Sequence, residues 1–66
     1  MKFSLYDVVT LDVNLPDSGL TKGMIGTVVD VYSSPFEAYE SEFCDDQGQT
    51  IVLLPLEAGQ LKLLQA

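Results

Sequence analysis

Turn-forming residues divide this chain into five short segments, and this division restricts its possible folds more than any other feature. The interruptions are NLPDSG (14–19), SSPFE (33–37), DDQG (45–48) and PLEAGQ (55–60). The segments between them are rich in β-branched and aromatic residues, which favour strands. Short strands about ten residues apart, with a turn signal between each pair, predict a small all-β domain.

The expected strands lie at 5–13, 25–32, 37–44, 49–54 and 61–64. PLEAGQ is too short for an α-helix and predicts a single 3₁₀ turn before the last strand. This order of elements is the plan of an SH3-like barrel. We therefore expect residues 1–66 to form one domain, a five-stranded SH3-like small barrel.

The alternation of side chains along each strand indicates the core. We expect it to contain Val9, Leu11, Ile25, Val29, Val31, Tyr39, Phe43, Val52, Leu54 and Leu61. The third segment alternates most clearly, because Tyr39, Ser41 and Phe43 share one face. Glu40 and Glu42 lie on the other face, which predicts a half-buried strand with an acidic outer surface.

The fourth segment continues as TIVLLPL (50–56), which is apolar on both faces. A strand of a small barrel has only one inner face, so the second face needs a separate explanation. Either the N-terminal segment around Phe3 and Leu5 covers it, or it is an exposed interface for a partner or a second copy. The sequence leaves both alternatives open.

The charge balance bears on the kind of partner. Ten acidic residues against three lysines and no arginine give a net charge of −7. Because nucleic-acid binding depends on neutralising phosphates with Lys and Arg, a nucleic-acid partner is not expected. The same field would attract a cationic partner, or the acidic residues serve only to keep a small apolar domain soluble.

Residues suited to catalysis or cofactor binding are scarce. The chain has no histidine, and Cys44 is its only cysteine, which argues against a zinc site and excludes an internal disulfide. Catalysis by a nucleophile needs a base beside it, and a chain without histidine has few candidates for that base. Glu40 and Glu42 could form a catalytic carboxylate pair, but their spacing fits a solvated strand face. DDQG lacks the spacing of a calcium loop. We expect no enzyme activity, metal, cofactor or small-molecule substrate.

The N-terminal segment MKFSLYDVV has no apolar core of the kind found in signal peptides. No run approaches the ~18 apolar residues of a membrane span. A single free cysteine fits a reducing compartment. We therefore expect a cytoplasmic protein without a membrane partner.

The segment TKGMIGTVVDVY (21–32) places two glycines three residues apart before an apolar run. A phosphate-binding P-loop needs G-x-x-x-x-G-K-[ST] and a following helix, whereas a strand is expected here. We interpret Gly23 as a turn into the strand. Gly26 would allow the close approach of another backbone or a bulky core side chain, or permit a bulge. Gly48 suits the left-handed position of the DDQG turn.

KGMIGTVVDVY resembles the glycine-containing segment K-G-D-x-G-x-V-x-x-V of KOW-type and other SH3-like barrels, with Met24 in place of the aspartate. Nearly the whole chain resembles a family of short bacterial proteins, domain of unknown function 4926, through YDVVTL, KGMIGTVVDVY, AYESEF, DDQGQT and a closing QL. Ser41 departs from the apolar residue expected at its position. The resemblance supports the fold and implies no activity. KOW barrels often occur in ribosome- and transcription-associated proteins.

Together these features favour a non-catalytic interaction module that binds a protein partner or itself. A basic partner would fit an accessory, antitoxin or immunity-like role. The candidate surface consists of Glu40, Glu42, Ile51 and Leu53. The alternative is a KOW-like module that binds nucleic acid or the ribosome, which would gain support if Lys2, Lys22 and Lys62 clustered on one face.

Overall fold

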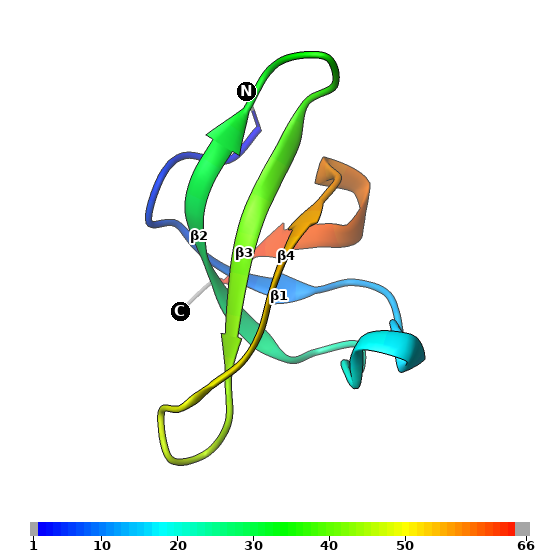
Figure 1. Ribbon diagram of the computed structural model, residues 1–66, viewed down its shortest axis with the longest axis vertical. Helices are drawn as coiled ribbons and strands as arrows, with labels where there is room; N and C mark the ends of the chain where they lie inside the picture. The colour runs from blue at the N-terminus through cyan, green and yellow to red at the C-terminus, as the bar shows by residue number, and fades with distance from the viewer. Residues whose placement is uncertain (1, 65–66) are drawn as a thin grey trace.

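The computed structural model describes residues 2–64, and these residues form one sheet of five antiparallel strands (Figure 1). In chain order the strands and 3₁₀ turns (η) are β1 (Val8–Leu11), η1 (Pro16–Ser18), β2 (Ile25–Tyr32), β3 (Ala38–Cys44), β4 (Thr50–Leu56), η2 (Ala58–Gln60) and β5 (Leu61–Leu63). The strand order is β4-β3-β2-β1-β5. The all-β prediction is confirmed, as is the 3₁₀ turn before the last strand.

The sheet is open. Within residues 2–64, β4 and β5 form its two edges, and no strand pairing joins them. The expected closure into a barrel is therefore not found. Instead, β1 and β5 run across the direction of β3 and β4, because the eight-residue β2 bends between its pairing with β1 and its pairing with the far end of β3 (Figure 1). The curved sheet wraps around the core.

Six strand ends differ from their predicted positions, four of them by one or two residues at the start of β3, both ends of β4 and the end of β5. β1 is shorter at both ends and covers 8–11 instead of 5–13. β1 begins three residues later than expected, because the preceding segment forms a turn in which the Asp7 amide donates to the Ser4 carbonyl (3.0 Å) and Tyr6 has a φ of 69°. β4 continues through Pro55, which we expected to interrupt it. The strand tolerates this proline because it lies at the edge of the sheet. The turn η1 was not expected.

A bulge in β2 changes which of its residues face the core. The register against β3 shifts between Val28 and Asp30, and the Asp30 carboxylate accepts the Val31 amide at 2.8 Å. Before the bulge the even-numbered residues face inward, so Val28 is buried and Ile25 is 55% exposed. Beyond it Val31 packs against the core. The prediction of Ile25 and Val29 as core residues is wrong, because an extra residue reverses the alternation.

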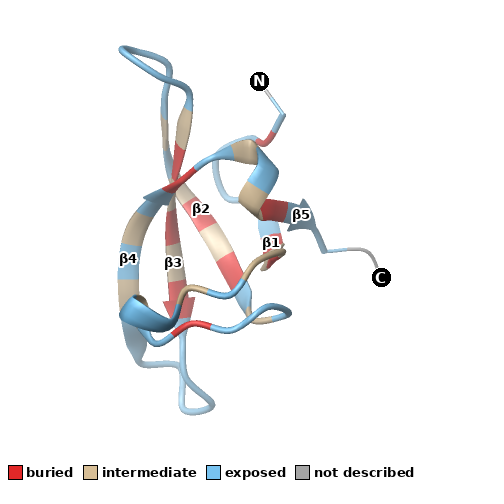
Figure 2. Cartoon of the chain, turned by 90° about the vertical axis from the view of Figure 1, so that its right-hand side faces the viewer, coloured by how far each residue is buried: buried red, intermediate tan, exposed pale blue. Residues whose placement is uncertain are grey.

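The core fills the inner side of this curved sheet (Figure 2). Its buried apolar members are Phe3, Val9, Leu11, Leu20, Val28, Tyr39, Phe43, Leu56 and Leu61, with Val31, Val52 and Leu54 among the side chains packed against them. Apart from Ile25 and Val29, every predicted core residue is in one of these two groups. Phe3 and Leu20 escaped prediction because they lie outside the strands and show no alternation.

Tyr39 holds the N-terminal segment in the core. Its ring meets that of Phe3 edge to face, with centroids 5.1 Å apart and an interplanar angle of 82°. The Tyr39 hydroxyl accepts hydrogen bonds from the Lys2 amide (2.9 Å) and the Phe3 amide (3.4 Å) and donates to Glu37 Oε1 (2.8 Å). The N-terminal segment therefore contributes to the inner face of the sheet.

Ser41 is buried on the inner face of β3 between Tyr39 and Phe43. Its hydroxyl donates to the Tyr39 carbonyl at 2.9 Å. A buried hydroxyl needs a partner, and this local bond supplies one. The departure from an apolar residue is accommodated without opening the core.

The three glycines singled out in the sequence lie where a side chain would be strained or would collide. Gly23 and Gly48 have φ values of 97° and 79°, and the Gly48 amide closes the DDQG turn by donating to the Asp45 carbonyl at 3.0 Å. At Gly26 an added Cβ would lie 2.7 Å from Cε1 of Phe43. Gly26 is therefore required for close approach of a core ring.

Candidate interaction surface

The four predicted surface residues come together on the outer side of β3 and β4. Glu42 lies directly opposite Leu53 in the β3–β4 register, and Glu40 lies opposite Pro55. Cross-strand partners point to the same face of a sheet, so an acidic row on β3 adjoins an apolar row on β4. Ile51 is also exposed, at the extra residue where the β3–β4 register shifts between Thr50 and Val52, and it adds a third apolar side chain beside Leu53. We call these five residues the β3–β4 outer face.

The apolar row of this face is not covered by the N-terminal segment. Ile51 is 45% exposed and Leu53 is 52% exposed. Of the two residues expected to cover them, Phe3 is buried in the core beside Tyr39, and Leu5 is itself 47% exposed. Of the two explanations for the second apolar face of β4, intramolecular cover is therefore wrong. An exposed apolar row on an edge strand remains.

The acidic row extends onto β2. Asp30 lies opposite Glu40 in the β2–β3 register. Glu40 Oε2 accepts a hydrogen bond from the Tyr32 hydroxyl (3.3 Å), and Glu42 Oε2 accepts one from the Thr50 hydroxyl (3.0 Å). Glu40 Oε1 is buried and, within residues 2–64, has no hydrogen-bond partner. The carboxylates of Asp30, Glu40 and Glu42 thus lie close together, with few hydrogen-bond donors beside them.

This concentration of negative charge affects Tyr32. Partial burial raises the pKa of the Tyr32 hydroxyl above its ordinary value, and the charges of Glu40 and Asp30 and the hydrogen bond to Glu40 raise it further. The neutral hydroxyl remains a donor to a carboxylate over a wider pH range. The alternation of β2 already puts Asp30 and Tyr32 on the face opposite Val31, but the sequence did not predict that the β2–β3 register brings them beside Glu40.

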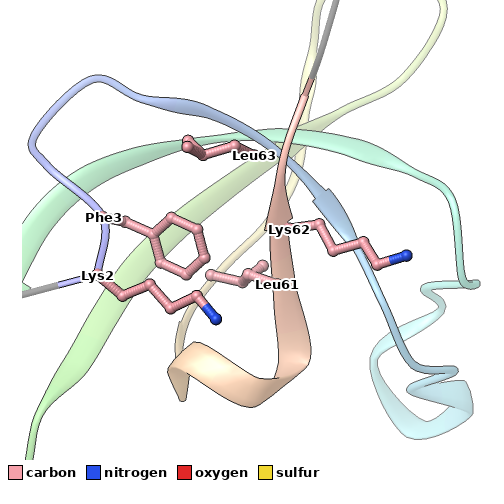
Figure 3. Close-up of a pocket in the computed structure, with 5 residues that line it drawn as sticks. All are labelled: Lys2, Phe3, Leu61, Lys62 and Leu63. Carbon is pink, nitrogen blue, oxygen red and sulfur yellow. The ribbon is translucent and has the colours of Figure 1, made fainter.

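The lysines lie on other elements. Lys2 and Lys62 line one hollow of about 570 Å³ together with Phe3, Leu61 and Leu63 (Figure 3). Lys62 leaves β5 on the side opposite to the two leucines, and its Nζ lies 3.6 Å from Asp12 Oδ1. Lys22 does not line the hollow. The cations therefore do not form one cluster, and none belongs to β3 or β4.

Other chemistry has little support in the described residues. Residues 2–64 contain no group of three histidine, cysteine, aspartate or glutamate side chains arranged to hold a metal ion. Cys44 is a free and exposed thiol at the end of β3. In the same part of the chain, no helix has the length and apolar character needed to cross a membrane.

Residues 2–64 thus define a small, open, all-β domain whose outer face joins an acidic row to an apolar row. The family model Domain of unknown function (DUF4926) matches residues 5–63, and the chain belongs to this family. No curated protein and no solved structure matches the chain. The match includes every strand from β1 to β5.

Proposed function

We propose that this protein is a non-catalytic interaction module that binds a basic protein through the β3–β4 outer face. The observation that carries the proposal is the direct pairing of Glu42 with the half-exposed Leu53. The stem of a lysine or arginine can cover Leu53 while its charged head reaches Glu42. An apolar row beside an acidic row therefore suits a cationic, amphipathic surface better than a purely polar one.

The charge of the whole molecule supports the same partner. A net charge of −7 attracts cationic proteins over long distances and accelerates their encounter. It also disfavours self-association through this face, because two copies would bring Asp30, Glu40 and Glu42 toward the same residues of the other copy. An accessory, antitoxin or immunity-like role would use such a surface to neutralise a basic protein.

Two finer assignments accompany this proposal. We infer an SH3-like strand plan, because the turn η2 separates β4 from a short β5 that returns to pair with β1. We also propose a cytoplasmic location, for which the single free thiol of Cys44 is the support.

A second candidate function is a nucleic-acid-binding module of the KOW type. The observation in its favour is that Lys2 and Lys62 line the same hollow. The pairing of Lys62 with Asp12 and the net charge of −7 oppose it. Titration with a single-stranded RNA at low and high salt distinguishes the two candidates, since only the second requires salt-sensitive RNA binding.

The decisive test of the first candidate uses the product of the neighbouring gene as the binding partner and calorimetry as the measurement. Leu53→Ser should weaken binding by about tenfold or more, because it removes the apolar contact and leaves the net charge unchanged. Leu63→Ser is the matched control, since Leu63 is similarly exposed (47%) on the opposite edge strand. Equal affinity of the two variants would contradict the proposal.

Folding of the Leu53→Ser variant is checked by circular dichroism. A half-exposed position tolerates a polar side chain, so the variant should retain the native spectrum. Light scattering at micromolar concentration should show a monomer for the parent chain. A parent dimer that dissociates in the Leu53→Ser variant would show that a second copy, and not a basic protein, occupies this face.

A further inference from the structure

β4 presents an open strand edge next to the proposed binding face. Among residues 2–64 it is the outermost strand of the sheet and pairs only with β3. Outside the strand pairings, no backbone hydrogen bond among residues 2–64 involves residues 50–56. One row of backbone donors and acceptors on β4 is therefore free, and such a row is a template for another strand.

The free row includes Leu53 and Pro55, the odd-numbered residues of β4 that follow the register shift between Thr50 and Val52. Backbone groups along a strand point alternately toward its two neighbours. Leu54 pairs with Ser41 of β3, and Pro55 next to it has no N–H to lose at the free edge. Glu42 uses its backbone groups for Thr27 of β2, so its partner Leu53 directs both its N–H and its C=O outward. This assignment starts from the bond between the Leu11 amide and the Met24 carbonyl, which shows which residues of β2 face β1. The alternation then continues through the β2–β3 and β3–β4 pairings to Leu53.

Side chains beside this edge specify the composition of an added strand. Its outward side chains would lie next to Ile51 and Leu53, about 4.8 Å away across the strand spacing. Glu42 lies one strand further, within reach of a lysine or arginine extending over Leu53. Its inward side chains would meet the partly buried Val52 and Leu54, which favour apolar residues.

We propose that the partner binds as an extended segment of alternating basic and apolar residues that adds a sixth strand to the edge of β4. This inference rests on the proposed function and specifies how the β3–β4 outer face recognises its partner. Backbone bonds at Leu53 hold the segment, and Glu42 selects its basic residues. Pro55 limits the register to residues 50–54, because it offers no donor beyond them.

A second copy of this chain is a poorer occupant. Its own β4, TIVLLPL, is edge-exposed but carries no basic residue. Pairing two copies would also bring the two acidic rows, each containing Glu40 and Glu42, onto one continuous sheet. Charge complementarity therefore selects a basic segment from another protein.

The test uses a capped seven-residue peptide of alternating lysine and valine, which matches the length of β4. The chain is assembled by ligation at the Phe43–Cys44 junction, so that single backbone amides can be N-methylated. N-methylation at Leu53 removes the edge donor and keeps the side chain. N-methylation at Leu63 is the control. The Leu64 amide donates to the Val8 carbonyl, so the neighbouring Leu63 amide points away from β1 to the open edge of β5, and its methylation breaks no strand pairing.

Binding is measured by fluorescence anisotropy of the labelled peptide. N-methylation at Leu53 should raise the dissociation constant by about tenfold, through loss of a backbone bond and a steric block. The Leu63 control should bind as the parent does. A peptide with glutamate in place of lysine should not bind. In hydrogen exchange, the Leu53 amide should become protected when the lysine peptide is bound.

Each contrary result has a distinct meaning. Equal affinity after N-methylation at Leu53, with binding still weakened by Leu53→Ser and Glu42→Gln, overturns strand addition and leaves the proposed function intact. Unchanged binding in both side-chain variants overturns the proposed function. No binding of the lysine peptide at about 1 mM overturns strand addition. The unbound chain could also self-associate. If N-methylation at Leu53 abolishes that self-association, the added strand belongs to a second copy, and the proposal of a basic segment is overturned.

Discussion

Substitution of Gly26 by alanine tests how tightly β2 and β3 are packed at the centre of the sheet. An added Cβ would lie 2.7 Å from Cε1 and 2.8 Å from Cδ1 of Phe43, and 2.9 Å from the carbonyl oxygen of Glu42. Favourable contacts between carbon atoms occur at about 3.5–4.0 Å. The ring of Phe43 is fully buried and the Glu42 carbonyl belongs to the sheet, so neither can move away without disturbing its neighbours.

The expected cost is the balance of two effects. Overpacking of a filled core costs about 1–3 kcal/mol. The loss of glycine's freedom in the unfolded chain returns about 0.4–1 kcal/mol. Gly26→Ala should therefore destabilise the fold by about 1–2 kcal/mol. A domain of this size has only about 3–5 kcal/mol from its core, so the loss is a large fraction of its stability.

The assay is urea unfolding followed by circular dichroism. With a slope of about 1 kcal/mol per molar urea, the midpoint should fall by about 1–2 M. Gly59→Ala is the matched control, because no atom lies within 4 Å of its added Cβ. Combination of Gly26→Ala with Phe43→Leu should cost less than the sum of the two by about 0.5 kcal/mol or more. A Gly26→Ala midpoint equal to that of Gly59→Ala would refute the close-approach argument.

Three further predictions concern other parts of the fold. Tyr39→Phe should cost about 1–3 kcal/mol in urea unfolding and speed hydrogen exchange of the two N-terminal amides, which lose their acceptor; unchanged exchange would contradict that anchor. The Tyr32 hydroxyl, followed by NMR, should titrate above its ordinary pKa and closer to it in Glu40→Gln. Because the folded state holds this proton more tightly, stability should fall as the pH rises from about 10 through the raised pKa. Ile25→Thr should change stability by less than about 0.5 kcal/mol, whereas Val28→Thr should cost about 1–3 kcal/mol; the reverse order would place the bulge wrongly.

The strands could be predicted from the sequence because their signals are local. DDQG contains its own turn geometry, with Gly48 at a positive φ, and β3 alternates between Tyr39-Ser41-Phe43 and the two glutamates. Alternation has a period of two residues, so a short stretch of sequence is enough to assign its faces. The acidic outer row of the candidate surface followed from the same pattern.

The tertiary structure decided what depends on pairing between distant segments. The sequence marks neither the bulge that buries Val28 and exposes Ile25 nor the continuation of β4 through Pro55. Phe3 lies in the core, where its amide donates a hydrogen bond to the hydroxyl of Tyr39, 36 residues away in the sequence.

The candidate surface combines both kinds of information. The residue types of β3 and β4 are set by the sequence, and each strand's alternation indicates which of them point outward. The placement of Glu42 directly beside Leu53, and the open edge next to them, are set by strand register and sheet order. Register is a non-local property, because it depends on which hydrogen bonds form between two strands and on where a bulge shifts them.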